Sequence, residues 1–275
     1  MSKNWKIRKD LSIEVYGHTL FRIECTQDFK EIKAGTLGGF IEKEENLDDN
    51  AWVYGNAKVS GNAKVYGNAE VYGNAEVYGN AKVYGNAKVS SDAWVYGDAK
   101  VYGNAKVSDN AWVSGDAKVY GNAKVYDNAW VSGDAKVYGN AKVYDNAWVY
   151  GNAKVSGNAK VYGNAEVYGD AEVYGDAKVY GNAKVSGDAW VYGDEIKSRN
   201  DICHISNRYY NITITTLHIK IGCQYHAQEA WWNFTDEQIK KMDRESALSF
   251  WKIWKEPLKQ ICAAMKKEKG EDNAE

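Results

Sequence analysis

The chain has 275 residues, a formal net charge of −2 and a pI near 6.2. This balance argues against general nucleic-acid binding, because such proteins carry an excess of Lys and Arg. No apolar run approaches the roughly 18 residues that a membrane-spanning helix needs, and residues 1–5 do not lead into a signal-peptide core. We therefore expect a cytoplasmic protein that does not associate with membranes.

Residues 1–50 have a β-like pattern. Alternating apolar residues on both sides of Gly17-His18 predict a hairpin formed by residues 12–16 and 19–24. Glycines at 35, 38 and 39 mark loops before Phe40. We expect this segment to cap the open end of the structure that follows, because an uncovered end would expose strand edges.

Residues 51–194 are 24 consecutive hexads of the form AxV[YS][GSD][ND], without insertion or deletion. A fixed period this short is typical of a solenoid. Alternation along a strand sends the Ala and Val of each hexad to one face and the variable and Tyr/Ser positions to the other. The Gly-Asn or equivalent pair then turns the chain, because both residues tolerate positive φ.

A second period of 18 residues indicates three hexads per coil. It appears in the spacing of Trp94, Trp112, Trp130 and Trp148, and again in Asp109, Asp127 and Asp145. The repeat then forms about eight three-sided coils, and at a strand spacing of about 4.8 Å the prism is roughly 38 Å long. Stacked Ala and Val leave a narrow, dry interior. Functional groups must therefore lie outside the prism, at its ends or between chains.

The run VYGNAK resembles the hexapeptide repeat of the left-handed parallel β-helix family, which includes acyltransferases, carbonic-anhydrase-like proteins and bacterial scaffolding proteins. The resemblance implies an all-β, left-handed parallel β-helix and a trimeric assembly like that of many relatives. Acyltransferases of the family use a catalytic His and a protruding loop. Residues 51–194 contain neither a His nor an insertion, so this sequence disfavours catalysis, family-type metal binding and any cofactor.

The outward positions of successive coils form three different faces. The candidate ligand or partner surface consists of one Trp column and one column each of Lys and Tyr: Trp94, Trp112, Trp130, Trp148, Lys82, Lys100, Lys118, Lys136, Tyr84, Tyr102, Tyr120 and Tyr138. The Lys and Tyr columns are either a solvated face or a cationic, aromatic surface for a nucleotide. The Trp column is either a contact surface or a ladder that stabilises the prism.

Residues 195–275 leave the hexad register. Two strands are predicted at 211–215 and 217–221, a helix from Thr235-Asp236, and a second helix from about Ser246 with an apolar seam. Pro257 should kink or interrupt that second helix. We expect the helices to cover the last coil. Gly222 to His226, followed by Trp231-Trp232-Asn233-Phe234, is similar to appendages on hexapeptide-repeat proteins of phages and prophages.

Histidine and cysteine gather only in the C-terminal segment. The candidate metal ligands are Cys203, His204, His218, Cys223 and His226, of which the last two have CxxH spacing. The same residues are equally ordinary packing residues of a strand-rich cap, so we assign no metal. The irregular spacing of the four cysteines indicates reduced thiols.

These observations favour a non-enzymatic binding or scaffolding protein that is oligomeric, with a trimer preferred, and that presents its columns to a protein partner. The alternative is a sponge that sequesters small anionic nucleotides or sugar phosphates, which could be phage-encoded. A hexapeptide-repeat acyltransferase comes third. The expected organisation is a β cap at 1–50, a β-helix at 51–194, and strands with amphipathic helices at 195–275.

Overall fold

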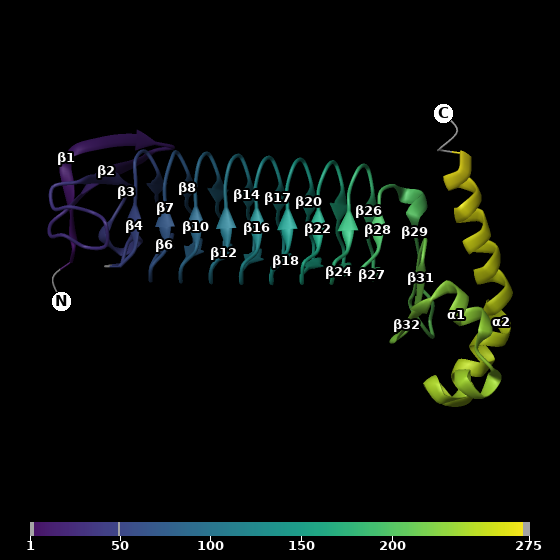
Figure 1. Ribbon diagram of the computed structural model, residues 1–275. Helices are drawn as coiled ribbons and strands as arrows, with labels where there is room; N and C mark the ends of the chain where they lie inside the picture. The colour runs from purple at the N-terminus through teal and green to yellow at the C-terminus, as the bar shows by residue number, and fades with distance from the viewer. Residues whose placement is uncertain (1–2, 49, 272–275) are drawn as a thin grey trace.

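The computed structural model describes residues 3–48 and 50–271. These residues form a long rod (Figure 1). A small N-terminal sheet leads into a three-sided parallel β-solenoid, and an antiparallel sheet and two helices lie at the far end. The fold class predicted from the hexads is therefore confirmed, while the left hand of the coil stays a prediction.

Three sheets run along the prism, one for each side, and we name each by its outward residues. The Trp face comprises β5 (Lys58–Val59), β8 (Glu76–Val77), β11 (Trp94–Val95), β14 (Trp112–Val113), β17 (Trp130–Val131), β20 (Trp148–Val149), β23 (Glu166–Val167) and β26 (Lys184–Val185). The Lys106 face comprises β4 (Trp52–Val53), β7 (Glu70–Val71), β10 (Lys88–Val89), β13 (Lys106–Val107), β16 (Lys124–Val125), β19 (Lys142–Val143), β22 (Lys160–Val161), β25 (Lys178–Val179) and β28 (Glu195–Ile196). The Lys118 face comprises β6 (Lys64–Val65), β9 (Lys82–Val83), β12 (Lys100–Val101), β15 (Lys118–Val119), β18 (Lys136–Val137), β21 (Lys154–Val155), β24 (Glu172–Tyr174) and β27 (Trp190–Tyr192).

The core of the prism is made of the fixed Ala and Val positions. Every one of them, from Ala51 to Val191, has 0% exposed surface. Each Val from Val53 to Val173 pairs in register with the Val 18 residues later, as Val119 does with Val137. At the corners the backbone has positive φ, for example +71° at Gly121, where an added Cβ would lie 3.0 Å from the Gly139 nitrogen. The corners therefore stack too closely for most side chains.

The solenoid extends beyond the hexads at both ends and has about nine turns. At the N-terminal end, β1 (Trp5–Val15), β2 (His18–Cys25) and β3 (Leu37–Ile41) pair antiparallel, and β3 then pairs in parallel with β5. A short helix, η1 (Glu44–Asn46), follows.

The hairpin between β1 and β2 turns at Tyr16-Gly17, one residue earlier than predicted. Both residues have positive φ, 51° and 80°, as a two-residue hairpin turn requires. The N-terminal segment also covers Trp52, whose ring lies 5.5 Å from that of Phe29. Trp52 is fully buried, so this variable position does not point to solvent as expected.

The last coil is covered by an antiparallel sheet rather than by helices, which corrects the sequence prediction (Figure 1). After η2 (Arg199–Asp201), the sheet comprises β29 (Ile202–Ile205), β30 (Ile212–Thr215), β31 (His218–Ile221) and β32 (Gln224–Ala227). Alternation gives it two faces. Ile212 and Ile214 pack with the helices, whereas Thr213 and Thr215 bond to the end of the prism.

The helices α1 (Gln228–Asn233) and α2 (Asp236–Glu271) lie on the far side of this sheet (Figure 1). Thr235 caps α2, since its hydroxyl accepts from the Gln238 amide at 3.3 Å. The helix breaks at Asp243 and Arg244 and continues through Pro257, so the predicted interruption at Pro257 is wrong. None of the described helices is long and apolar enough to cross a membrane.

Candidate functional site

The four Trp of the Trp face form one column, as their spacing predicts. Trp94, Trp112, Trp130 and Trp148 pair in register on successive strands. The first two rings are stacked with centroids 5.0 Å apart, and Trp130 is tilted by 57° from Trp112. Trp148 is 46% exposed and the other three are half-buried. The column is therefore partly a stacked ladder and partly an open apolar surface.

Carboxylates border this column along both edges of the face. The corners that lead into the four Trp strands carry Ser91, Asp109, Asp127 and Asp145, which have φ between 58° and 60°. They are the only residues other than glycine with positive φ among the described residues of the prism. The opposite corners carry Asp98, Asp116 and Asp134, all exposed. Strained backbone and acidic side chains thus gather around the Trp column.

At each end of the Trp face, a Lys and a Glu form an ion pair. Lys58 pairs with Glu76 at 2.7 Å before the column, and Lys184 pairs with Glu166 at 2.6 Å after it. The Lys106 face has the same arrangement, because Lys88 pairs with Glu70 and Lys178 with Glu195. Four lysines between those two pairs have no carboxylate within ion-pair distance among the described residues: Lys106, Lys124, Lys142 and Lys160.

On the Lys118 face, the predicted Lys and Tyr columns also lie in register. Lys82, Lys100, Lys118 and Lys136 are paired strand to strand. Beside them, Tyr84, Tyr102, Tyr120 and Tyr138 stack with centroids 4.9–5.0 Å apart and interplanar angles of 2–3°. Neighbouring tyrosines therefore cover one another's ring faces. The column presents ring edges and hydroxyls outward, not open faces on which a base could stack.

A recess of 810 Å³ lies where the Lys118 face meets the C-terminal sheet. Lys118, Lys136 and Trp190 line it on the prism side, and Tyr209 and Tyr210 on the sheet side. Within it, Lys154 pairs with Glu172 at 2.7 Å, and the Lys220 ammonium lies 4.4 Å from the Trp190 ring centroid. Lys118 and Lys136 have no ion pair among the described residues. The recess is also lined by five carboxylates, so its charge is mixed: Asp116, Asp134, Asp170, Glu172 and Asp188.

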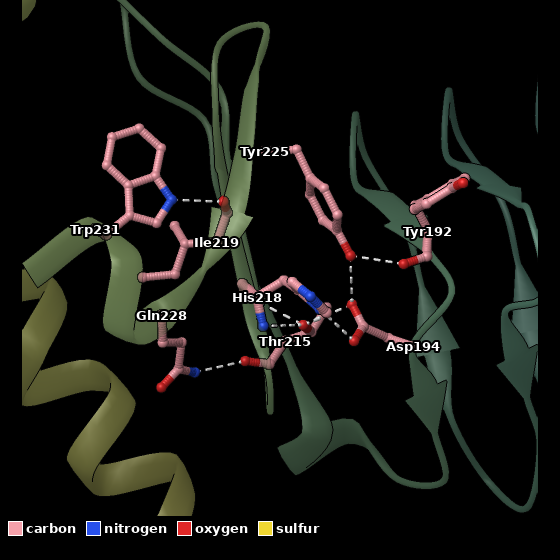
Figure 2. Close-up of polar contacts among 8 residues, drawn as sticks. All are labelled: Tyr192, Asp194, Thr215, His218, Ile219, Tyr225, Gln228 and Trp231. Atoms are coloured by element: carbon pink, nitrogen blue, oxygen red, sulfur yellow. Dashed lines mark hydrogen bonds and ion pairs between the residues drawn. The ribbon is translucent and has the colours of Figure 1, made fainter. Parts of the chain in front are cut away.

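The C-terminal sheet is joined to the prism through Asp194 (Figure 2). Its carboxylate is fully buried and accepts from the Thr215 hydroxyl at 2.8 Å. It also lies 2.7 Å from His218 Nδ1 and 3.2 Å from the Tyr225 hydroxyl. Burial, together with Asp194, raises the pKa of Tyr225 well above its ordinary value. Sequence reasoning missed this joint, although the Ile-Thr-Ile-Thr alternation of β30 indicates a polar face.

The candidate metal ligands do not come together. His218 bonds to Asp194 on the prism side of the sheet, whereas the His226 ring packs against Trp231, 5.3 Å away, on the helix side. Cys223 is exposed in the turn between β31 and β32. Across the described ranges, no group of three or more His, Cys, Asp or Glu side chains has the geometry to hold a metal ion.

Burial lowers the pKa of His204 and His226 below the ordinary value of 6.5. Asp188 and Lys220 act on His204 in opposite directions, with smaller effects than burial. The unfolded chain then binds protons that the folded chain does not, so stability falls as the pH drops below about 6.5. We expect the urea midpoint for unfolding of the C-terminal cap, followed by Trp fluorescence, to fall between pH 7.5 and 5.5. A double variant, His204→Gln with His226→Gln, should show a flatter dependence, and an equally steep one would contradict this assignment.

Comparison with known families gives a match at the C-terminal end of the prism. A family model described as the YdcK beta solenoid repeat matches residues 177–193, in the last hexads of the prism. The chain is a β-solenoid repeat protein. A comparison with curated proteins finds no match. The matched segment ends next to Asp194 and includes none of the four Trp of the column.

Proposed function

We propose that this solenoid is a non-enzymatic binding or scaffolding protein that assembles through its Trp face. The observation that carries the proposal is the uncharged Trp column with acidic edges, closed at both ends by ion pairs. Exposed apolar surface of this kind marks contact sites, and Trp is enriched at interface hot spots. The acidic edges select a partner that combines apolar surface with positive charge.

The Lys106 face of a second copy has this chemistry. Its four unpaired lysines lie between two ion pairs, as the four Trp do, and Lys106 follows Trp94 by only 12 residues in an 18-residue coil. The two columns therefore occupy the same stretch of the prism axis. Lys stems can cover Trp rings while the ammonium groups reach the Asp edges. Because two different faces meet, the contact is heterologous, and its repetition gives a ring when the rotation between copies closes. The trimer itself rests on the resemblance to hexapeptide-repeat proteins.

Two quadruple variants test the assembly by light scattering. Changing Trp94, Trp112, Trp130 and Trp148 to Lys should reduce the native mass to that of the 30.8 kDa monomer. Changing Lys106, Lys124, Lys142 and Lys160 to Gln should do the same, because it removes the partner charges. Lys already occupies the variable position of most hexads, so the first variant should fold.

The matched control changes Lys82, Lys100, Lys118 and Lys136 to Gln on the Lys118 face, and this variant should keep the parent mass. A Trp-to-Lys variant that keeps its mass and loses only thermal stability would show that the Trp column stabilises the prism and takes no part in assembly. Such a loss would amount to about 0.5–1.5 kcal/mol for each stacked pair.

A second candidate function, sequestration of a small anionic ligand, is favoured by the recess beside Lys118 and Lys136. Because the Tyr ring faces are covered, the ligand would be held through phosphate or carboxylate groups and hydroxyls rather than by base stacking. The same Lys118-face variant tests it. The parent should bind inorganic phosphate or carry a co-purified compound that absorbs near 260 nm, and the variant should lose it. Equal anion content in both proteins would exclude this function.

A further inference from the structure

The C-terminal cap contains a second cavity, which neighbours the recess on the Lys118 face because Tyr210 lines both. It has a volume of 220 Å³ and lies between the C-terminal sheet and α2. Its walls include Tyr210, Trp231, Phe250 and Trp251, with Met242 beside them. Ligand pockets for drug-sized molecules are roughly 300–1,000 Å³. This cavity therefore suits a smaller compound or a single head group.

One charged side chain stands at this cavity. Among the described residues that line it, Asp243 alone carries a formal charge. Asp243 is exposed, and the Tyr210 hydroxyl donates to its carboxylate at 2.6 Å. The hydrogen bond fixes one carboxylate oxygen and leaves the other available. An aromatic cavity with a single anion at its mouth complements a cation that is itself largely apolar.

The backbone at Asp243 is held in an unusual conformation. Asp243 has φ −156° and ψ 50°, and Arg244 has φ 51° and ψ −142°, inside what is otherwise one helix. A non-glycine residue with this φ and ψ is strained, and such strain is concentrated at ligand sites. The break lets the helix line the cavity from both sides, with Ile239 and Met242 before it and Phe250 and Trp251 after it. It also places the Asp243 carboxylate within hydrogen-bond distance of the Tyr210 hydroxyl.

Two aromatic rings of this cap lie close to Lys ammonium groups, those of Trp251 in the cavity wall and of Trp232 outside it. The Lys255 ammonium lies 5.6 Å from the Trp251 ring centroid, and that of Lys259 lies 5.9 Å from Trp232. We propose that the cavity binds a small alkylammonium compound, whose apolar substituents contact the aromatic walls and whose positive charge faces the Asp243 carboxylate. This binding is independent of the assembly proposed above.

Choline and 3,3-dimethyl-1-butanol, its uncharged isostere, test the proposal by calorimetry on the full-length protein. Choline should bind at least tenfold more tightly than the isostere. Asp243→Asn keeps the shape of the side chain and should reduce choline affinity more than tenfold. Glu245→Gln is the matched control. It removes a carboxylate two residues from Asp243, and Glu245 pairs with Lys240 and does not line the cavity. This variant should bind choline as the parent does.

Cys223 provides a second readout. It lines the cavity and is the one exposed cysteine of the four, while burial raises the pKa of Cys25, Cys203 and Cys262, the last to about 11. An alkylating reagent at pH 7.5 should therefore label Cys223 first. Choline should slow this labelling in the parent and in Glu245→Gln, but not in Asp243→Asn. Equal affinity for choline and its isostere, unchanged binding by Asp243→Asn, or no protection of Cys223 at millimolar choline would each overturn the proposal.

Discussion

The Val125→Asp variant is expected to lose the folded prism, whereas Lys124→Asp is expected to keep it. Val125 has no exposed surface and pairs in register with Val107 and Val143 in the coils on either side. A carboxylate at this position has no partner in an interior built of Ala and Val. Burying an unpaired charge costs more than about 4 kcal/mol, which is a large part of the 5–15 kcal/mol that stabilises a typical domain.

Lys124 is the matched control because it is the neighbouring residue of the same strand and points outward. Its side chain is exposed and lies between Lys106 and Lys142 in a column of like charges. Aspartate at 124 relieves repulsion with both neighbours, and surface charges change stability by less than about 1 kcal/mol. Circular dichroism during urea unfolding separates the two variants. If Val125→Asp unfolds at the parent's urea midpoint, the inward orientation of the Val positions is wrong.

The prism could be predicted from the sequence because each hexad meets the same surroundings. Side-chain alternation decides that Val125 points inward, and the 18-residue spacing decides that Trp94 lies beside Trp112. Neither inference needs a contact between distant parts of the chain. Ring orientation does need one, since Trp130 tilts and its indole N–H lies 3.4 Å from the hydroxyl of Ser114 in the preceding coil. The sequence therefore located the columns but not which ring faces stay open.

The C-terminal segment was harder to predict because its contacts are not periodic. Cys203 and His204 are neighbours in one strand and point to opposite sides of the sheet. His218 and His226 also lie on opposite sides, so the five candidate ligands are not brought to one place. The pattern of Ile212 to Thr215 showed a strand with one polar face. It did not show that Thr215 on this face forms a hydrogen bond with Asp194, because that contact depends on how the sheet packs against the last coil.

Replacing Asp194 by Ala is expected to release the C-terminal cap from the prism. The buried carboxylate forms hydrogen bonds with Thr215, His218 and Tyr225. A hydrogen bond to a charged group contributes about 1.5–3 kcal/mol to stability. Removing it leaves the buried Thr215 and the half-buried His218 without this acceptor, while the Tyr225 hydroxyl keeps its bond to the Tyr192 carbonyl at 2.6 Å. The cap should then detach in a large fraction of molecules, while the prism stays folded.

Asp176 is the matched control, since it occupies the same corner one coil earlier. It is exposed at that corner, and among the described residues its carboxylate accepts only from the Asn158 amide, at 3.0 Å. Asp176→Ala should therefore shift stability by less than about 1 kcal/mol. Limited proteolysis after residue 194 should cut Asp194→Ala much faster than Asp176→Ala. Light scattering should show aggregation of Asp194→Ala alone, because release of the sheet exposes the strand edges of the last coil. Equal protease resistance and equal mass in the two variants would show that apolar contacts hold the cap without the Asp194 joint.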